Sequence, residues 1–346
     1  MNKRALHLLV SLLIAGLFIW LAFRSVDLQE LGRQIQSISF GWILPFTLTL
    51  LFSHYLRAER WRLLLKQEEQ SARRPILFAG VMTGYFVNNF VPRLGEVTRP
   101  LYVAKKENLP SGTLFGTIIL ERLIDMASML FITAIAAFTF SREIGLFEKL
   151  LGLDEWNRSF YLFIPVFLGL MVLVLRYGFR WIHHIHNKQK PHSPLTHKIL
   201  TTLISFGDGI GSLRHVKNWP LFLLLTIGIW SGYILMAFFP FYMLDLGELY
   251  GLGLPEALIL TLISSVGLAI PTPAGIGSYH LLIQQGLALI YQVPAETGLT
   301  YATVTHAATF LVVLLFTPIV LWWAKWFDMT HPKRIGEKSD SELPAS

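Results

Sequence analysis

Long apolar runs, separated by short polar and charged segments, account for most of the chain. A helix needs roughly 20 residues to cross a hydrocarbon core about 30 Å thick. The runs that reach or approach this length predict spanning helices at Leu6–Phe23, Phe40–Leu56, Pro110–Phe140, Phe160–Leu175, Leu221–Leu244 and Tyr301–Ala324. The pattern therefore predicts an all-α polytopic membrane protein with about six spanning helices.

Two further apolar regions are too short or too interrupted to be ordinary spans. Ile76–Val91 is only about 24 Å long as a helix, and cations flank it on both sides, at Arg73 and Arg74 and again from Arg93 onward. Because cations favour the cytoplasmic side, both of its ends are expected there. This segment is therefore predicted to be a re-entrant hairpin.

The second interruption is Pro271-Thr272-Pro273-Ala274-Gly275-Ile276-Gly277, which separates Ala257–Ile270 from Ala274–Tyr291. No cation follows either apolar segment, so a second re-entrant hairpin is expected to enter from the outer side. Broken helices are tolerated at membrane depth only where protein or a water-lined cavity surrounds them. We therefore expect the two breaks to border one substrate chamber.

Each half then has the order span, span, hairpin, span, with opposite starting sides. This is the pattern of an inverted-topology repeat, with a first repeat at 1–145 and a second at 155–330 in a single transmembrane domain, 1–335. Lys3 and Arg4 place the N-terminus in the cytoplasm, and Lys325 indicates the same side for the C-terminus. Residues 336–346 are expected to be a disordered cytoplasmic tail. Arg24–Ser39 is expected to be an outer loop, and Leu195–Leu213 to lie at the interface or within the bundle.

The composition agrees with a multi-pass protein of the cytoplasmic membrane. Hydrophobic residues make up 53% and charged residues 15% of the sequence, with a mean hydropathy of +0.52, whereas soluble domains carry about 25% charged residues. The net charge of +7 is attributed to cytoplasmic loops and lipid headgroups rather than to nucleic acid. The absence of cysteine excludes disulfides, thiol nucleophiles and cysteine-ligated metals.

Glu121, Arg122 and Asp125 form the first group of candidate site residues. The two carboxylates are four residues apart on one helical face and repel each other, so a cation should lie between them. Arg122 is the nearest candidate, and Arg93 or Arg99 could fold back to the same place. We therefore expect loss of Arg122 to destabilise the protein. The group is either a structural ion-pair cluster or a polar site for a headgroup or coupling ion.

Arg93, Glu96 and Arg99 follow one another at intervals of three and are expected to line one helical face. The planar guanidinium fork suits phosphate or carboxylate, and phosphodiester headgroups are the abundant anions of a bilayer. The alternative interpretation is positive-inside anchoring of a loop.

The second break supplies the remaining candidates. Gly275 and Gly277 free the amides that begin the next helix, whose N-terminus attracts anions, and His280 and Gln284 follow on one face. We expect no metal site, because the histidines from His183 to His197 stand in a polar loop without acidic partners. No catalytic residues and no cofactor are predicted, since nucleophile, P-loop, dinucleotide and zinc motifs are absent.

These residues resemble the lysylphosphatidylglycerol synthase transmembrane-region family of flippase-like membrane proteins. The resemblance covers nearly the whole chain and rests on the following motifs: Arg60-Trp61, Pro92-Arg93-Leu94-Gly95-Glu96 with Arg99, Glu121-Arg122 with Asp125, and Pro271–Gly277. It implies movement of a lipid between leaflets. The soluble aminoacyl-transferase domain of some members is not expected, because little sequence follows the last span.

The preferred function is thus translocation of a phospholipid or lipid-linked headgroup across the cytoplasmic membrane. One alternative is a non-transporting membrane partner that docks a separate lipid-modifying enzyme. A further alternative is an intramembrane transferase that uses Glu121 or Asp125 as a base.

Overall fold

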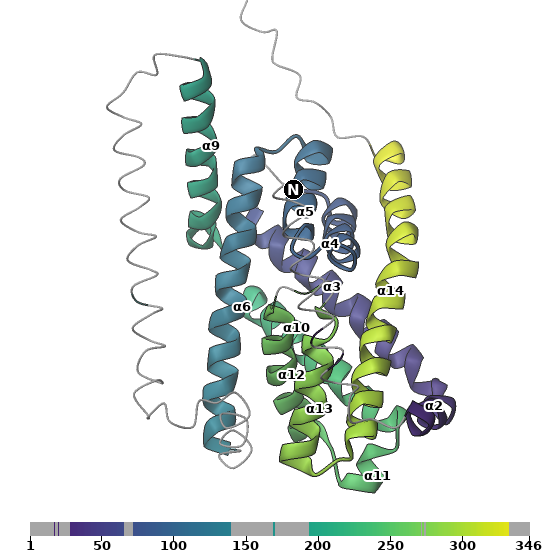
Figure 1. Ribbon diagram of the computed structural model, residues 1–346. Helices are drawn as coiled ribbons and strands as arrows, with labels where there is room; N and C mark the ends of the chain where they lie inside the picture. The colour runs from purple at the N-terminus through teal and green to yellow at the C-terminus, as the bar shows by residue number, and fades with distance from the viewer. Residues whose placement is uncertain are drawn as a thin grey trace, which may run out of the picture.

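The computed structural model describes residues 28–65, 72–139, 194–270, 272 and 275–331, together with the single positions 17, 20 and 169. Helix is the only regular secondary structure in these ranges. The longer helices are α2 (Leu28–Gln36), α3 (Ile43–Leu65), α4 (Arg74–Asn88), α5 (Gly95–Glu107), α6 (Ser111–Thr139), α9 (Pro194–Gly211), α10 (Trp219–Met243), α12 (Leu254–Ala269), α13 (Ser278–Tyr291) and α14 (Ala295–Thr330). Figure 1 shows their arrangement.

Two of the described helices, α10 and α14, are long and apolar enough by length and composition to cross a membrane, and α12 is a shorter apolar helix. Helices α3 and α6, of 23 and 29 residues, are also long, but each carries charged residues in its interior. The expected spans Leu6–Phe23 and Phe160–Leu175, apart from positions 17, 20 and 169, lie outside the described residues, as does the tail 336–346.

Helices α4 and α5 form the first hairpin, with the break at residues 89–94 between them. The close approach of the two helices requires glycine at position 95. A Cβ added there would lie 2.0 Å from the carbonyl oxygen of Gly84 on the facing helix. The Gly95 amide donates instead to Asn88 Oδ1 at 2.7 Å, which ties the start of α5 to the end of α4. The segment Ile76–Val91, which was predicted to be a re-entrant hairpin by itself, is thus only the first arm of a two-helix unit.

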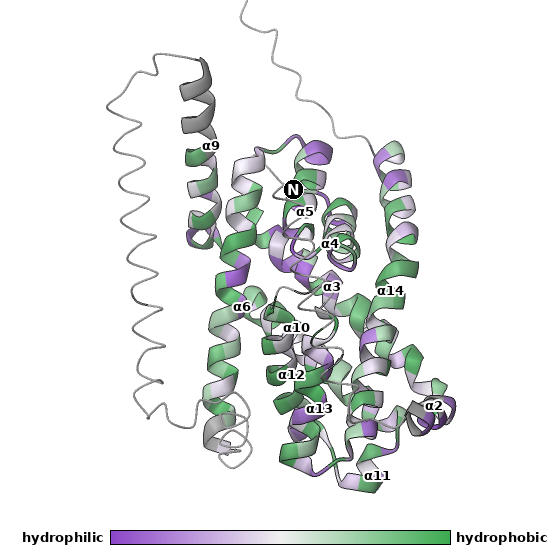
Figure 2. Cartoon of the chain, in the orientation of Figure 1, coloured by the Kyte–Doolittle hydropathy of each residue, from purple (hydrophilic) through white to green (hydrophobic). Residues whose placement is uncertain are grey.

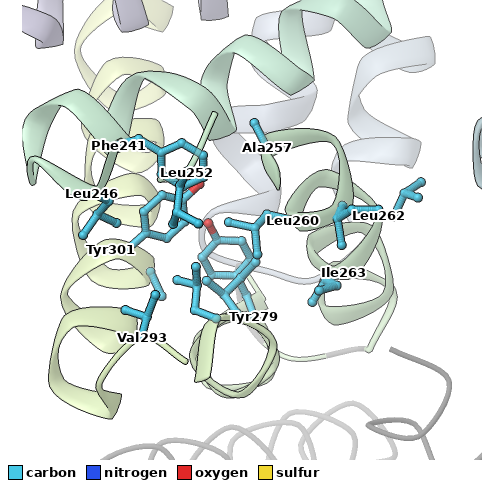
Figure 3. Packing of buried hydrophobic residues seen from close by; sticks show 14 of the residues in the cluster. Phe241, Leu246, Leu252, Ala257, Leu260, Leu262, Ile263, Tyr279, Val293 and Tyr301 are labelled. Carbon is cyan, nitrogen blue, oxygen red and sulfur yellow. The ribbon is translucent and has the colours of Figure 1, made fainter. Parts of the chain in front are cut away.

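Helices α12 and α13 form the second hairpin, as the Pro-rich interruption predicted. They pack closely: a Cβ at Gly267 would lie 3.0 Å from the Cα of Tyr279. The hairpin contributes to the largest apolar cluster, in which Ile259, Leu260 and Ile263 contact α13 and α14 residues such as Tyr301 (Figure 3). This cluster holds the second half of the chain together.

The order of elements is similar in the two halves. Helix α2 or α9 and a 3₁₀ turn (Phe40–Trp42 or Ser212–His215) precede a long helix, a helical hairpin and a second long helix, and the second half also has the short helix α11 (Leu246–Tyr250) between α10 and α12. In each half the hairpin contacts the long helix that ends the other half, giving the pairs α4–α14 and α12–α6, while α2 packs on α14 and α9 on α6. The hairpins lie toward opposite ends of the molecule (Figure 1).

One expectation about connecting segments is wrong. Arg24–Ser39 contains the helix α2 rather than only a loop, and its Gln34 bonds to α14, donating to Thr297 Oγ1 at 3.2 Å and accepting from Thr300 Oγ1 at 2.9 Å. Helix α9 packs along α6, in agreement with the expectation that 195–213 lies at the interface or within the bundle.

Candidate functional site

A row of polar residues on α3 faces the interior of the first half. His54, Arg57 and Trp61 follow at intervals of three and four, which places them on one helical face together with Arg60. All four are buried, and the Arg60 side chain is completely so. Figure 2 shows the matching hydrophilic band on α6, between apolar turns above and below it.

Asp125 of α6 joins two of these arginines. Arg57 Nη1 donates to Asp125 Oδ2 at 2.9 Å, and Arg60 Nη2 donates to Asp125 Oδ1 at 2.6 Å. Arg60 Nη2 also lies 3.8 Å from Glu121 Oε1. Arg60 is therefore the cation that separates the two α6 carboxylates. The other terminal nitrogen of Arg57 donates to the Tyr233 hydroxyl of α10 at 2.6 Å, which links the site to the second half.

Arg99 of α5 completes this group from the first hairpin. Its Nη2 forms an ion pair of 2.8 Å with Glu121 Oε2. The geometry of this contact is not that of a hydrogen bond. The guanidinium lies 4.0 Å over the Trp61 ring, an arrangement favoured by the charge distribution of the indole face. Arg57, Arg60, Arg99, Glu121 and Asp125 are called the arginine cluster below.

The arginine cluster is not electrically balanced. Three guanidiniums face two carboxylates among the described residues, which leaves one positive charge uncompensated. Several buried donors also have no hydrogen-bond partner there, including Arg60 Nη1 and the Nε atoms of all three arginines. Buried charges are costly unless paired and hydrogen-bonded, so this arrangement favours an anion.

His54 lies beside this cluster and also has polar atoms that make no hydrogen bond to the described residues. Its ring stacks on Tyr85 of α4 with centroids 4.0 Å apart. Both ring nitrogens are buried without a hydrogen-bond partner among the described residues. A neutral imidazole in this state can donate one hydrogen bond and accept another.

The remaining candidates of the first half lie outside the arginine cluster. Arg122 was expected to balance the two carboxylates, but it is half-exposed and pairs with Glu96 at 2.8 Å. Consecutive residues of a helix are rotated by about 100°, so Arg122 points away from its neighbour Glu121, and its side chain turns outward to Glu96 rather than toward Asp125. Arg93 has a left-handed backbone (φ 61°) in the break rather than a place on a common face with Arg99.

Arg93 nevertheless makes an informative contact. Its Nη2 donates to the carbonyl oxygen of Ala269, the last residue of α12, at 3.2 Å. The contact joins the tip of the first hairpin to the residue preceding the second break. The two interruptions, which are far apart in sequence, therefore meet in the folded chain.

The second break is organised by its glycines and by Ser278. Gly275 and Gly277 have φ values of 76° and 88°, which side chains rarely adopt. The Gly275 amide donates to Thr272 at 3.0 Å, so it is already used within the turn. The Ser278 hydroxyl donates to the Gly267 carbonyl at 2.8 Å, which closes the hairpin.

His280 and Gln284 lie on α13 but have separate surroundings. The His280 ring lies 5.1 Å from the ring of His306 on α14, measured between centroids. Gln284 is buried and donates from Nε2 to the Ala295 carbonyl at 3.2 Å, which fastens α13 to the start of α14. These contacts stay within the second half. The histidine-rich stretch from His183 to His192 lies outside the described residues.

Sequence reasoning missed the contribution of α3. Arg57 and Arg60 begin a run of cations that is typical of the flank of a spanning helix, so their residue type alone does not mark them as site residues. Their helical spacing with His54 and Trp61 was the available sign that they face inward. The site is thus built by α3, α5 and α6 together, with Tyr233 from α10.

A helical bundle with apolar spanning helices, two broken hairpins and a buried charge cluster defines a helical membrane protein. The chain belongs to the family described as "Lysylphosphatidylglycerol synthase TM region", whose model matches residues 8–316.

Two relatives are archaeal proteins from Methanocaldococcus jannaschii. The UPF0104 membrane protein MJ1595 is 34% identical over 128 residues, which is 36% of this chain and 38% of that protein. The UPF0104 membrane protein MJ1078 is 26% identical over 234 residues, 67% of this chain and 86% of that protein. No solved structure matches the chain.

Proposed function

We propose that this protein moves a lipid or lipid-linked headgroup across the cytoplasmic membrane. The observation that carries the proposal is the arginine cluster, which has one positive charge in excess and buried donors without partners. A lipid headgroup with a phosphate supplies the missing anion. Arg57, Arg60 and Arg99 would contact it, and Glu121 and Asp125 would orient the arginines.

The arrangement of the two hairpins supports a path through the molecule. They lie toward opposite ends of the molecule (Figure 1), and the two breaks come together where Arg93 contacts Ala269. If the hairpins move, a headgroup can reach a site near the two hairpin tips first from one side of the membrane and then from the other. The Gly275–Gly277 turn and His280 would border the same path from the second half, while Glu96 and Arg122 would lie at its edge.

The paired contacts of the two halves support an inverted-topology repeat as the basis of this movement. The pairs α4–α14 with α12–α6, and α2–α14 with α9–α6, are those that a two-fold axis in the membrane plane would relate. We propose re-entrant hairpins, cytoplasmic termini and repeats at about 1–145 and 155–330 on this basis.

A leaflet-exchange assay tests the proposal. The purified protein is reconstituted in phosphatidylcholine and phosphatidylglycerol vesicles with a trace of nitrobenzoxadiazole-labelled phosphatidylglycerol, and a membrane-impermeant reductant bleaches the outer leaflet. Passive exchange is slow, so protein-free vesicles should bleach by about half. Vesicles with the native protein should bleach beyond that fraction.

Arg99→Gln should lower this exchange, because it removes a guanidinium that faces the proposed headgroup. Arg214→Gln is the matched control, since Arg214 is exposed and its Nε donates to the Gly211 carbonyl of its own turn. Equal exchange by native protein and Arg99→Gln would remove the arginine cluster from the path. No exchange by native protein with any labelled lipid tested would favour a docking role for a separate lipid-modifying enzyme.

A further inference from the structure

An ion-pair group closes the end of the molecule where α5 and α14 finish. Arg73, just before α4, donates from Nε to Glu107 Oε1 at 2.9 Å and from Nη2 to Asp328 Oδ1 at 2.7 Å. Lys106 Nζ donates to Asp328 Oδ2 at 3.0 Å. Arg73, Lys106, Glu107 and Asp328 are called the end cluster. It connects the first hairpin to the last helix of the opposite half.

Arg73 remains protonated in this position. Burial by itself lowers the pKa of the guanidinium, but its hydrogen bonds to Glu107 and Asp328 outweigh burial and raise the pKa above its ordinary value. Arg73 Nη1 also donates to the His331 carbonyl at 2.8 Å. The end cluster therefore holds the end of α14 through side-chain and backbone groups.

The same two elements stay in contact deeper in the molecule. Ile76, Ala79 and Met82 of α4 pack with Val320 and Ala324 of α14 in one buried apolar group. Further along, the Asn89 amide lies 3.5 Å from the Phe310 carbonyl. Helix α4 of the first hairpin thus lies against α14 along its length.

The corresponding contact in the other half, between α12 and α6, is much less extensive. By the pairing of the two halves, α12 should lie against α6 as α4 lies against α14. In the described residues, α6 contributes Ala136, with Met129 and Ile132 beside it, to the cluster that contains α12. The α12 hydroxyl of Thr261 bonds within α12 and to the Tyr233 carbonyl of α10, not to α6. No ion pair between α12 and α6 occurs in the described part of the chain.

From this asymmetry we propose that the end cluster is a gate, and that the structure represents the state in which this gate is closed. The proposal rests on the proposed lipid movement. Opening requires the first hairpin to separate from α14, which breaks the pairs of Asp328 with Arg73 and Lys106. The second hairpin then packs more closely on α6. In that state the α12–α6 contact is the extensive one and the α4–α14 contact is the open one.

The exposure of the end cluster suits reversible opening. The side chains of Asp328 and Lys106 are 25% and 37% exposed, and ion pairs that water reaches contribute little individually. A few such pairs can favour the closed state without locking it, because a small free-energy difference leaves a minor state populated. A more deeply buried pair, such as that between Arg60 and Asp125, whose side chains are 0% and 16% exposed, would be more costly to separate in each cycle.

A distance measurement tests the gate without relying on lipid movement. The protein has no cysteine, so Lys105→Cys and Met329→Cys, both at exposed positions, place two spin labels across the gate in phosphatidylglycerol-containing nanodiscs. Asp328→Asn in this background should shift part of the population to longer distances. Arg74→Gln is the matched control, because Arg74 pairs with Glu59 within the first half, and it should leave the distances unchanged.

A reversible cross-link provides the functional arm. Lys106→Cys with Asp328→Cys, bridged by a reducible bis-methanethiosulfonate reagent, should reduce leaflet exchange to the protein-free level, and reduction should restore it. Each single cysteine variant treated with the reagent controls for modification alone. Full exchange in the bridged protein, or distances unaffected by Asp328→Asn, would overturn the gate. Absence of exchange in native protein would overturn the proposed function, while the distance result would still decide the gate.

Discussion

At the scale of single residues, neighbouring charges of similar type have very different surroundings. Arg122 is half-exposed and pairs with Glu96 near the surface, whereas Asp125, one turn further along α6, holds two buried arginines. Removal of one partner from a buried ion pair leaves an uncompensated charge, while an exposed pair is screened by water. The contribution of each residue to stability therefore depends on which face of α6 it occupies.

We expect Asp125→Asn to lower the free energy of unfolding by about 3–5 kcal/mol, because Arg57 loses its charged partner and Arg60 loses the nearer of its two carboxylates. Arg122→Gln, the matched control on the same helix, should cost less than about 1 kcal/mol. Denaturant unfolding in detergent micelles measures both. An equal cost for the two variants would contradict this assignment of the buried charges.

At the scale of secondary-structure elements, the hairpins depend on close approach of two backbones. Gly95 at the start of α5 faces Gly84 of α4, and this contact leaves no room for a side chain. The approach also positions Arg99, one turn later on α5, against Glu121. Helix packing and the geometry of the arginine cluster are thus coupled through the first hairpin.

Gly95→Ala should destabilise the first hairpin by about 1–3 kcal/mol or more, because the new Cβ would lie 2.0 Å from the Gly84 carbonyl oxygen. Gly41→Ala is a suitable control, since nothing lies within 4 Å of a Cβ there. Thermal unfolding of the detergent-solubilised proteins compares them. A Gly95→Ala variant as stable as Gly41→Ala would mean that the two helices are not so closely packed.

At the scale of the whole molecule, the two halves pack in related ways but are not equivalent. Each hairpin contacts the final long helix of the other half, yet only the first hairpin has ion pairs to that helix among the described residues. An inverted repeat in a membrane would place the end cluster and the short helix α11 (Leu246–Tyr250) on opposite sides. Figure 1 shows α11 at the end of the molecule away from the end cluster.

Cysteine labelling tests this topology. A membrane-impermeant maleimide should label Lys105→Cys only from the cytoplasmic side and Glu248→Cys only from the outer side, because the charged flank of α5 follows the positive-inside rule. Both positions are exposed, and no native cysteine interferes. Labelling of both positions from the same side would exclude the inverted arrangement.

The sequence by itself determined the helical class, the positions of α6, α10 and α14, and the two interruptions. These features follow from local properties of a segment. The length of an apolar run predicts a helix, and proline and glycine interrupt it, whatever the segment packs against. The pairing of Glu121 and Asp125 on one face, and their need for a cation, was likewise readable from spacing.

Only the tertiary structure decided which cation that is. Arg60 lies 65 residues from Asp125 in sequence, and it stands in a run of cations, so nothing in the sequence pairs it with Glu121 and Asp125 in particular. The contact of Arg93 with Ala269 and the bonds of Arg73 and Lys106 to Asp328 also join distant segments. Such contacts depend on how helices cross and how closely their backbones approach, which is a property of the packed bundle rather than of any one segment.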